Sequence, residues 1–510
     1  MIKKSLLFLG LAIIVIFFLI RLFHLTILPI FADEAIYIRW SQIMRAEPTL
    51  RFLPLSDGKQ PLFMWLTIPF LKIFSDPLLA GRFLSILAGL GSLVGLFFVS
   101  WSLFKNKWVS FLSCFFYSLI PFFVFFDRLA LVDSMLMMFA IWLAFLSLRL
   151  VRLVRLDLSL ISGLVLGGAL ITKSPAIFFA LLLPSGLLLG EKLKKKILPL
   201  LGFWFLILVL GFGIYNFLLR LGPGFQMIAL RNRDYLFTFK EILSHPLDPL
   251  KPHLGDLGSW LPNLFTWPIL LLVLIGFILG LKTKLKVTLF LLLWFVVPLS
   301  AQLIFAKVFT PRYILFTLWP LLILAAFSLD WLRLKLKKKN WLLIILLLVI
   351  MVPALRYDWL LLTNPEKAPL PRNLRNGHLE EWTAGQGLKE SAEFLKERAK
   401  EGPVFVGTEG FFGTLPDGLQ VYLEGTSNIR VIGVGWPVME VHQSLINSLV
   451  DNEVYLLVNQ SRLKINPQER GLILVKEYPK AVWPNGSPRG EAGFQDKLLL
   501  FRLDKDYFQQ

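Results

Sequence analysis

The chain carries Leu6-Leu-Phe-Leu-Gly-Leu-Ala-Ile-Ile-Val-Ile-Phe-Phe-Leu-Ile20, an uninterrupted apolar run, followed shortly by Pro29-Ile-Phe-Ala-Asp-Glu-Ala-Ile-Tyr37, which contains two adjacent acids. An apolar run of this kind is typical of a helix that enters or crosses a bilayer. Asp33 and Glu34 then lie immediately beyond a membrane boundary. An acid in that position can be an ordinary solvated loop residue, so its meaning depends on the charges elsewhere in the chain.

The composition is that of a polytopic α-helical membrane protein. Of the 510 residues, 56% are hydrophobic and only 17% are charged, and the mean hydropathy is +0.67. The formal net charge of +19 does not indicate a nucleic-acid partner, because the basic residues form short clusters between apolar runs. The single cysteine, Cys114, lies in an apolar run, which excludes an intramolecular disulfide and a cysteine-based metal site.

The N-terminal segment has the basic start and apolar stretch of a signal peptide. Arg21-Leu-Phe-His24 follows the apolar run, however, where a cleavage site needs small residues. We therefore expect a retained membrane anchor.

Eleven apolar segments are candidates to cross a membrane, which takes about 20 residues per helix. A further helix at 61–74 is expected to be shallow. The predicted spans are at 5–23, 79–103, 109–126, 133–149, 157–172, 175–190, 197–219, 267–281, 286–306, 313–330 and 341–361.

The distribution of positive charge agrees with this count. If Lys3 and Lys4 are cytoplasmic, every second connection is also inner, and each of these connections is basic. The basic clusters are Lys105/Lys107, Arg149/Arg152/Arg155, Lys192/Lys194/Lys195/Lys196, Lys282/Lys284/Lys286 and Arg333/Lys335/Lys337/Lys338/Lys339. We expect a multi-pass protein of the cell (plasma or inner) membrane, with a cytoplasmic N-terminus and with the long loops 24–78 and 220–266 outside.

The composition changes after the last apolar run. Residues 1–362 are predicted to form the multi-span domain, and residues 363–510 an α/β domain outside the membrane. Periodicity predicts helices at 391–400 and 418–423, strands at 404–406, 431–434 and 454–458, and a strand at 498–503 that closes the sheet. Gly407, Gly410 and Gly413 do not form the dinucleotide-binding pattern and are interpreted as turn glycines.

Ionisable residues gather on the predicted outer side, several of them next to the end of a span. They are Asp33, Glu34, Asp57, Lys59, Arg82, Asp127, Arg128, Asp133, Lys173, Arg231, Arg233, Asp234, His245, His253, Lys307 and Arg312. Because charges at this depth are costly to desolvate, a function or a partner is the default expectation. For Lys59, Arg82 and Arg312 the alternative is that each extends to the lipid headgroups.

Acids and bases at the level of the headgroups suit transfer from a lipid-linked phosphate donor. The isoprenoid tail stays in the bilayer, and a lysine or arginine at the interface can stabilise the departing phosphate. A carboxylate opposite can deprotonate an acceptor hydroxyl. No nucleotide-binding loop is then needed, and the phosphate-loop motif is absent from the sequence.

Five motifs resemble the GT-C-type integral-membrane glycosyltransferases that use polyprenyl-phosphate sugars, namely the protein O-mannosyltransferases and the aminoarabinose transferases that modify lipid A. They are Asp33-Glu34-Ala-Ile-Tyr37, Gly58-Lys59-Gln-Pro-Leu62, Arg128-Leu-Ala-Leu-Val-Asp133-Ser-Met-Leu136, Ile171-Thr-Lys-Ser-Pro175 and Pro311-Arg-Tyr313. The resemblance covers roughly residues 5–330 in order and spacing. It implies a GT-C-like bundle and transfer of a hexose or pentose with inversion.

The resemblance also implies a role for each site residue. Asp33 would be the general base, with Glu34 beside it in acceptor positioning or charge balance. The donor phosphate would be bound by Lys59, Arg128 and Arg312. Supporting residues would be Asp133, which orients Arg128 or holds the site together, Tyr37 and Lys173.

The chain departs from the aminoarabinose branch at two positions. Ile36 stands where that branch has an arginine, and Gly58 stands where it has an acid before the lysine. A divalent metal held through that acid is therefore in doubt, and no other cofactor is implied. His245 and His253 are possible ligands, but their spacing is unspecific.

Other interpretations stay open. Asp33 can cap a helix over 35–44, Lys173 can be an interface anchor, and Trp382, Trp436 and Trp483 are expected to pack the outer domain rather than bind sugar. A flippase or transporter of lipid-linked glycans would need charges along a path through the membrane, and ionisable residues are nearly absent from the predicted spans. A membrane-anchored scaffold would leave the boundary charges without a role. The acceptor can be a lipid, a protein or a glycan.

Overall fold

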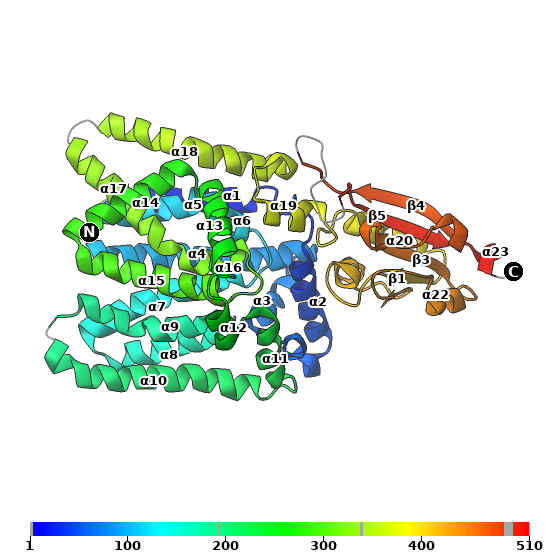
Figure 1. The fold of residues 1–510 in the computed structure, drawn as a ribbon, viewed down its shortest axis with the longest axis horizontal. Helices are drawn as coiled ribbons and strands as arrows, with labels where there is room; N and C mark the ends of the chain where they lie inside the picture. Colours follow the sequence, from blue (N-terminus) through cyan, green and yellow to red (C-terminus); the bar gives the residue numbers. More distant parts are fainter. Residues whose placement is uncertain (1–3, 192, 337–339, 484–492, 509–510) are drawn as a thin grey trace. The chain divides into compact units, whose positions relative to one another are not determined.

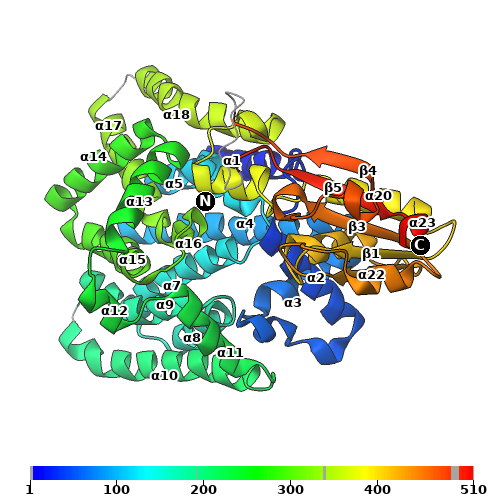
Figure 2. The same ribbon diagram turned by 45° about the vertical axis from the view of Figure 1, so that its right-hand side comes forward.

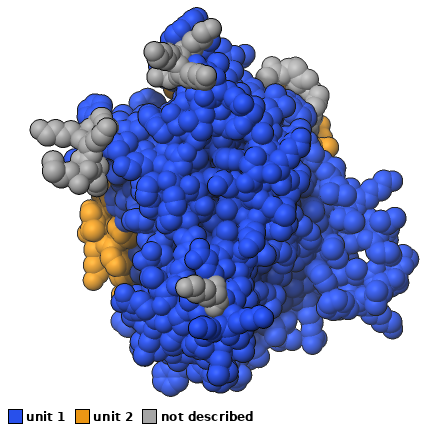
Figure 3. All heavy atoms as spheres, turned by 90° about the vertical axis from the view of Figure 1, so that its left-hand side faces the viewer, with its two compact units in different colours: residues 1–23, 47–66, 82–362 blue, residues 24–46, 67–81, 363–510 orange. Residues whose placement is uncertain are grey.

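The computed structural model describes residues 4–191, 193–336, 340–483 and 493–508. These residues form two compact units, which are coloured separately in Figure 3. Unit 1 comprises residues 1–23, 47–66 and 82–362, and unit 2 comprises residues 24–46, 67–81 and 363–510. Unit 2 thus joins the C-terminal region to two segments of the first long loop. Lys3, Lys192, Lys337, Lys338 and Lys339 of the predicted inner clusters lie outside the described residues.

Unit 1 consists of helices (Figure 1). Its long helices are α1 (Lys4–Leu22), α4 (Pro77–Phe104), α5 (Lys107–Leu119), α7 (Asp133–Leu153), α8 (Leu156–Leu170), α10 (Leu193–Leu219), α13 (Leu250–Leu264), α14 (Trp267–Thr283), α15 (Leu285–Phe305), α17 (Trp319–Leu336) and α18 (Asn340–Thr363). Shorter helices include α3 (Leu62–Thr67), α6 (Pro121–Asp127), α9 (Ile177–Leu182), α11 (Phe225–Tyr235), α12 (Phe239–Ser244) and α16 (Pro311–Ile314).

The chain is an integral multi-pass membrane protein. Among the described residues, five helices are long and apolar enough to cross a membrane, or up to 8 if each of three bent helix pairs forms one span. All eleven predicted segments are helical, but the apolar stretches Leu6–Leu22, Leu156–Leu170 and Ser174–Leu189 are only 10–17 residues long. The structure therefore supports 5 to 8 candidate spans, and eleven crossings stay a prediction.

The sequence explains two of the bends. Between α5 and α6 the axis turns by 62° at Pro121, which has no backbone N–H to continue the ladder of α5. Between α13 and α14 it turns by 108°, and Thr266 adopts the positive φ of 68° there, before the dipeptide Trp267-Pro268.

Unit 2 contains a mixed five-stranded sheet, which is visible in Figure 2 together with α20 (Leu388–Arg398) and α22 (Gln443–Ser448). The strand order is β2-β1-β3-β5-β4. β1 (Val404–Thr408) pairs in parallel with β2 (Ile429–Gly433) and β3 (Glu453–Asn459), whereas β5 (Lys497–Leu503) is antiparallel to β3 and to β4 (Leu472–Pro479). On one face, Val454, Leu456 and Val458 form a core with Phe405 and with Leu445 of α22.

The predicted strands and helices of this region are present, with one correction at the sheet edge. The segment 498–503 does not close the sheet, because β5 lies inside it and β4 forms the edge. β4 is mostly exposed along its length, so it lacks the buried alternation that would reveal it in the sequence.

Candidate active site

The predicted site residues are divided between the two units. Asp33, Glu34 and Tyr37 belong to unit 2. The other five belong to unit 1 and are Lys59, Arg128, Asp133, Lys173 and Arg312.

In unit 1, Asp133 and Lys173 form an ion pair. Asp133 is the first residue of α7, and its carboxylate accepts a hydrogen bond of 2.6 Å from the Lys173 ammonium group. The carboxylate is almost fully buried, whereas the lysine is 22% exposed. The ammonium lies 4.4 Å from the centre of the Tyr313 ring, which contributes a cation–π interaction. Lys173 is therefore a partner of Asp133 and not a simple interface anchor.

Arg312 directly precedes the same tyrosine in the sequence. Its guanidinium carbon is 5.1 Å from the Tyr313 ring centre, and its Nη2 is 3.5 Å from the Tyr313 hydroxyl. The short helix α16, which starts at Pro311, carries both residues. One aromatic ring thus contacts a lysine and an arginine from two different motifs.

Lys59 lies in a second cluster of charges, built on a tight turn. Its ammonium is 3.3 Å from Asp57, and the other carboxylate oxygen of Asp57 is 2.9 Å from Arg231 of α11. The turn residue Gly58 has a φ of +68°, and a Cβ there would lie 2.7 Å from the Met227 carbonyl oxygen. An acid at position 58 would therefore strain this turn, and Asp57 supplies the carboxylate beside the lysine.

Contacts between loops bring these motifs together. Gln60 donates a hydrogen bond of 2.8 Å to Ser174, and the Leu62 N–H donates to the Ile171 carbonyl. Tyr235 lies within electrostatic reach of both Lys59 and Tyr313, and burial raises its pKa. The segments around Lys59, Lys173 and Arg312 therefore gather in unit 1, together with Asp133.

The structure gives Arg128 a different environment. It is 2% exposed, and its Nη1 donates hydrogen bonds of 2.9, 2.8 and 2.8 Å to the carbonyls of Ile20, Arg21 and Phe23. These carbonyls belong to the end of α1 and the residue beyond it, where helical partners are lacking. Arg128 thus caps α1.

A buried ion pair next to Arg128 was not foreseen. Arg21 and Asp127, both fully buried, form an ion pair of 2.9 Å, and the Tyr117 hydroxyl donates to the same carboxylate. Asp358 of α18 is also buried nearby, within electrostatic reach of Arg21 and Arg128. Two arginines and two aspartates are thus buried together inside the helix bundle.

In unit 2, the acids Asp33 and Glu34 occupy the first turn of α2 (Ala32–Ala46). The Phe31 N–H, at the N-cap, donates a hydrogen bond of 3.0 Å to the Glu34 carboxylate, which is fully buried. Because the helix begins at Ala32, the capping carboxylate is that of Glu34 and not that of Asp33. Asp33 is partly exposed, and Tyr37, one turn further on, is buried.

The α2 helix is held firmly within unit 2. Arg39 donates to Gln420, Gln42 donates to the Val421 carbonyl, and Arg45 forms an ion pair of 2.8 Å with Glu424. At its start, the Ala32 N–H donates to the Thr383 carbonyl. The position of Asp33 is therefore fixed by the C-terminal region of the chain.

Metal ligands do not cluster in the part of the chain that the structure describes, where no group of three or more His, Cys, Asp or Glu side chains is arranged to hold an ion. His253 is buried, with Nδ1 2.8 Å from the Leu303 carbonyl and its ring against Phe309. His245 is exposed and 3.5 Å from Asp248. The two histidines thus have separate structural contacts.

The comparisons with known proteins agree with the resemblance. Residues 58–215 match the family model described as dolichyl-phosphate-mannose-protein mannosyltransferase. A comparison with curated protein sequences gives no match. The resemblance to membrane glycosyltransferases, first indicated by the five motifs, is confirmed over this range.

The fold is shared with solved structures over nearly the whole chain. ArnT from Cupriavidus metallidurans in the apo state superposes with a TM-score of 0.60 at 12% identity, covering 99% of this chain and 98% of that one. ArnT bound to undecaprenyl phosphate gives 0.56 at 15% identity, covering 98% of both chains. The Archaeoglobus fulgidus oligosaccharyltransferase in complex with Zn and sulfate gives 0.53 at 10% identity, covering 88% of this chain and 68% of that one.

Proposed function

We propose that this chain is an inverting glycosyltransferase that moves one hexose or pentose from a polyprenyl-phosphate donor to a hydroxyl acceptor on the outer face of the cell membrane. The match of residues 58–215 to a mannosyltransferase family and the ArnT-like fold support this function. The observation that carries the proposal lies in unit 1, where Lys59, Lys173 and Arg312 come from three separate motifs and gather around Tyr235 and Tyr313.

This cationic cluster suits a phosphate leaving group. Lys59 and Arg312 would bind the donor phosphate and stabilise the charge that develops as the bond to the sugar breaks. Arg231 is a further candidate, since it shares the Asp57 carboxylate with Lys59. Lys173 and Asp133 would hold the cluster in place as an ion pair.

The roles of Arg128 and Glu34 are refined by their contacts. The three carbonyls bound by Arg128 favour a positioning role at the end of α1 over the phosphate contact that the resemblance implies. The capping hydrogen bond of Glu34 likewise favours a role in orienting the first turn of α2, which presents Asp33.

In the proposed reaction, Asp33 acts as the general base. Its carboxylate takes the proton of the acceptor hydroxyl while the hydroxyl oxygen attacks the anomeric carbon. The bond between that carbon and the phosphate oxygen breaks in the same step, and the polyprenyl phosphate leaves with the electron pair. A single displacement of this kind inverts the configuration at the anomeric carbon. Tyr37 supports Asp33 from the next turn of the helix.

The proposed topology places this chemistry outside. We propose eleven crossings, in which the three short apolar helices cross together with the eight longer or bent candidates. The N-terminus is then cytoplasmic and the C-terminal region extracytoplasmic.

The function is tested by incubating the purified full chain, reconstituted in membranes, with a panel of polyprenyl-phosphate sugars and membrane extract as acceptor. Mass spectrometry should detect one added sugar and free polyprenyl phosphate for at least one donor. The proposal is overturned if no donor in the panel is consumed by protein whose fold is intact.

A further inference from the structure

One edge of the sheet in unit 2 collects residues that the proposed reaction does not use. Because β2, β1 and β3 are parallel, their carboxyl ends lie at the same edge. The residues that follow these ends are Trp436 after β2, Glu409, Phe411 and Phe412 after β1, and Arg462 after β3. In sheets of this kind, ligands bind outside the carboxyl ends of the strands.

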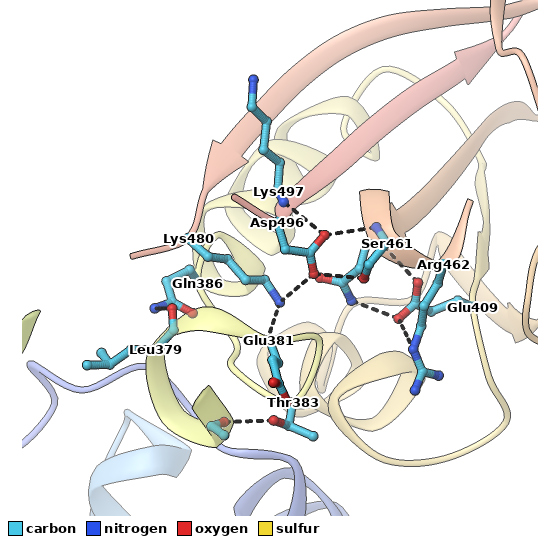
Figure 4. A network of polar contacts seen from close by, with 12 residues as sticks. Leu379, Glu381, Thr383, Gln386, Glu409, Ser461, Arg462, Lys480, Asp496 and Lys497 are labelled. Atoms are coloured by element: carbon cyan, nitrogen blue, oxygen red, sulfur yellow. Dashed lines mark hydrogen bonds and ion pairs between the residues drawn. The ribbon is translucent and has the colours of Figure 1, made fainter. Parts of the chain in front are cut away.

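Polar groups form the centre of this edge, as Figure 4 shows. The Glu409 carboxylate accepts hydrogen bonds of 2.8 and 2.7 Å from the backbone N–H and side-chain amide of Asn459, and it lies 3.7 Å from Arg462. Beside it, Asp496 accepts from Ser461. These hydrogen bonds fix the side chains of Glu409, Asn459 and Asp496 in position.

Two aromatic side chains contact Arg462 of the polar centre, and two more lie in the loop after β1. The Arg462 guanidinium lies 3.6 Å from the ring centre of Trp382 and 4.5 Å from that of Trp436. Trp436 is nevertheless 63% exposed, and Phe411 and Phe412 are 73% and 55% exposed. We call Trp382, Phe411, Phe412 and Trp436 the aromatic edge. Trp436 thus packs on Arg462 with one part of its ring and leaves most of its surface exposed.

The two loops that carry the exposed rings are joined. The Gly410 N–H donates a hydrogen bond of 3.0 Å to the Gly435 carbonyl, next to Phe411 and Trp436. A Cβ on Gly433 would lie 3.1 Å from the Phe411 Cα, so the loops are in close contact. The exposed rings are therefore presented on a fixed backbone.

The aromatic edge is also connected to the start of α2. Trp382 precedes Thr383, whose carbonyl accepts a hydrogen bond of 3.1 Å from the Ala32 N–H. The Gly385 N–H donates to the Ile30 carbonyl in the same segment. Asp33 follows Ala32 directly, so the segment that carries Trp382 is hydrogen-bonded within unit 2 to the helix turn that carries the candidate base.

We propose that the aromatic edge binds a saccharide, which is the acceptor of the transfer; the acceptor role rests on the function proposed above. The apolar C–H faces of sugar rings stack on exposed Trp and Phe rings. Sugar hydroxyls can accept hydrogen bonds from the Arg462 guanidinium, whose orientation is set by the buried Glu409 carboxylate. The Arg462 guanidinium beside the exposed rings suits a hydroxylated ligand better than the acyl chains of a lipid, because acyl chains cannot accept a hydrogen bond from it.

The experiment measures binding without any donor. The full-length chain is labelled with fluorotryptophan and placed in lipid nanodiscs, and the fluorine signal of Trp436 is assigned with Trp436→Phe. Four probes are titrated: cellotetraose, mannotetraose, chitotetraose and galactotetraose. At least one should shift the Trp436 signal saturably.

Variants locate the binding. In Phe411→Ala the dissociation constant should rise about tenfold, as expected for loss of roughly 1.4 kcal/mol of ring contact. Tyr507→Ala is the matched control, since this exposed ring follows β5 and lies at the opposite edge of the sheet. It should leave the dissociation constant unchanged. Asp33→Asn should bind the saccharide with the same dissociation constant as the wild type. Binding is thereby tested independently of the proposed catalytic role of Asp33.

Two results would overturn the proposal. The first is no saturable shift with any of the four saccharides. The second is broadening of the Trp436 signal by spin-labelled phosphatidylcholine in the nanodisc without a response to saccharide, which would make the edge a lipid contact. Saccharide binding without any transfer in the donor panel would retain the binding site and remove the acceptor role.

Discussion

Lys173 donates a 2.6 Å hydrogen bond to the buried Asp133 carboxylate, and the Tyr313 ring lies 4.4 Å from the same ammonium group. Lys173→Met would leave the carboxylate with no opposite charge in that position. We expect the protein to lose on the order of 2–3 kcal/mol of stability, because an unpaired buried charge is costly. A fall of several degrees in the melting temperature of the reconstituted chain would show this.

The conservative variant separates charge from geometry. Lys173→Arg keeps the positive charge and should recover most of the melting temperature, and the double variant Lys173→Met/Asp133→Leu should be less destabilised than Lys173→Met alone. Equal melting temperatures for the wild type and Lys173→Met would show that the pair contributes no stability.

The two adjacent acids of α2 should respond differently to loss of charge. Asp33→Asn should abolish sugar transfer while the protein level and donor binding stay nearly unchanged, because only the proton acceptor is removed. Glu34→Gln should retain part of the activity and lower stability by about 1 kcal/mol, as is usual for a weakened helix cap. Product analysis and thermal melting distinguish these effects. Full activity of Asp33→Asn would refute its role as the base.

Gly58 tests the turn that carries Lys59. Gly58→Ala would force a Cβ to within 2.7 Å of the Met227 carbonyl at a φ of +68°. The backbone must shift, at a cost of about 1–3 kcal/mol, and Lys59 moves with it. We expect weaker binding of polyprenyl phosphate, measured by calorimetry in detergent. Gly255→Ala is the control, since its Cβ would meet nothing within 4 Å.

Much of this arrangement was accessible from the sequence, because the signals are local. The motifs at Lys59, Lys173 and Arg312 could be listed from their residue types, and the strands from 404 to 458 from their short runs of apolar and β-branched residues. The pairs themselves could not, since Asp57 and Arg231 lie far apart in the chain and their contact depends on tertiary packing.

Arg21 shows the same limit within the helices. Read locally, it marks the end of an apolar run, whereas in the fold it is fully buried against Asp127. The available signal was the presence of an arginine and an aspartate at the ends of two different apolar segments. Conversely, the periodicity of the apolar residues in the C-terminal region predicts a sheet. It does not reveal that α2, from the first loop, belongs to the same unit.

The orientation of the chain is open to a direct test. A reporter that is active only outside the cytoplasm should be active when fused after Gln510 and silent when fused after Lys339. The physical reason is the retention of the basic clusters on the cytoplasmic side. The reverse pattern would place the cationic cluster of unit 1 on the wrong face for an outer acceptor.

The stability of unit 2 should depend on pH through Glu409. Burial raises the pKa of this carboxyl from the ordinary 4.5 to about 7, although hydrogen bonds from Asn459 and the charges of Arg462 and Lys480 oppose the shift. Between these two pH values the folded state keeps a proton that the unfolded state has released. The free energy of unfolding should therefore decrease as the pH rises through this window, by about 3 kcal/mol at most. Above the folded-state pKa, Glu409 makes no further contribution to the pH dependence of stability.

Glu409→Gln isolates this contribution. The neutral amide cannot ionise, so the variant should show a flatter dependence of melting temperature on pH between about pH 5 and pH 7. Lys480 does not mask the effect, because burial lowers its pKa only to about 8 and it stays protonated in both states below that pH. The control is Glu477→Gln, because Glu477 is an exposed residue of β4 that is paired with Lys497. This variant should keep the wild-type dependence of melting temperature on pH. Identical profiles for the wild type and Glu409→Gln would mean that the Glu409 carboxyl is ionised throughout this range, with Arg462 and the Asn459 donors compensating its burial.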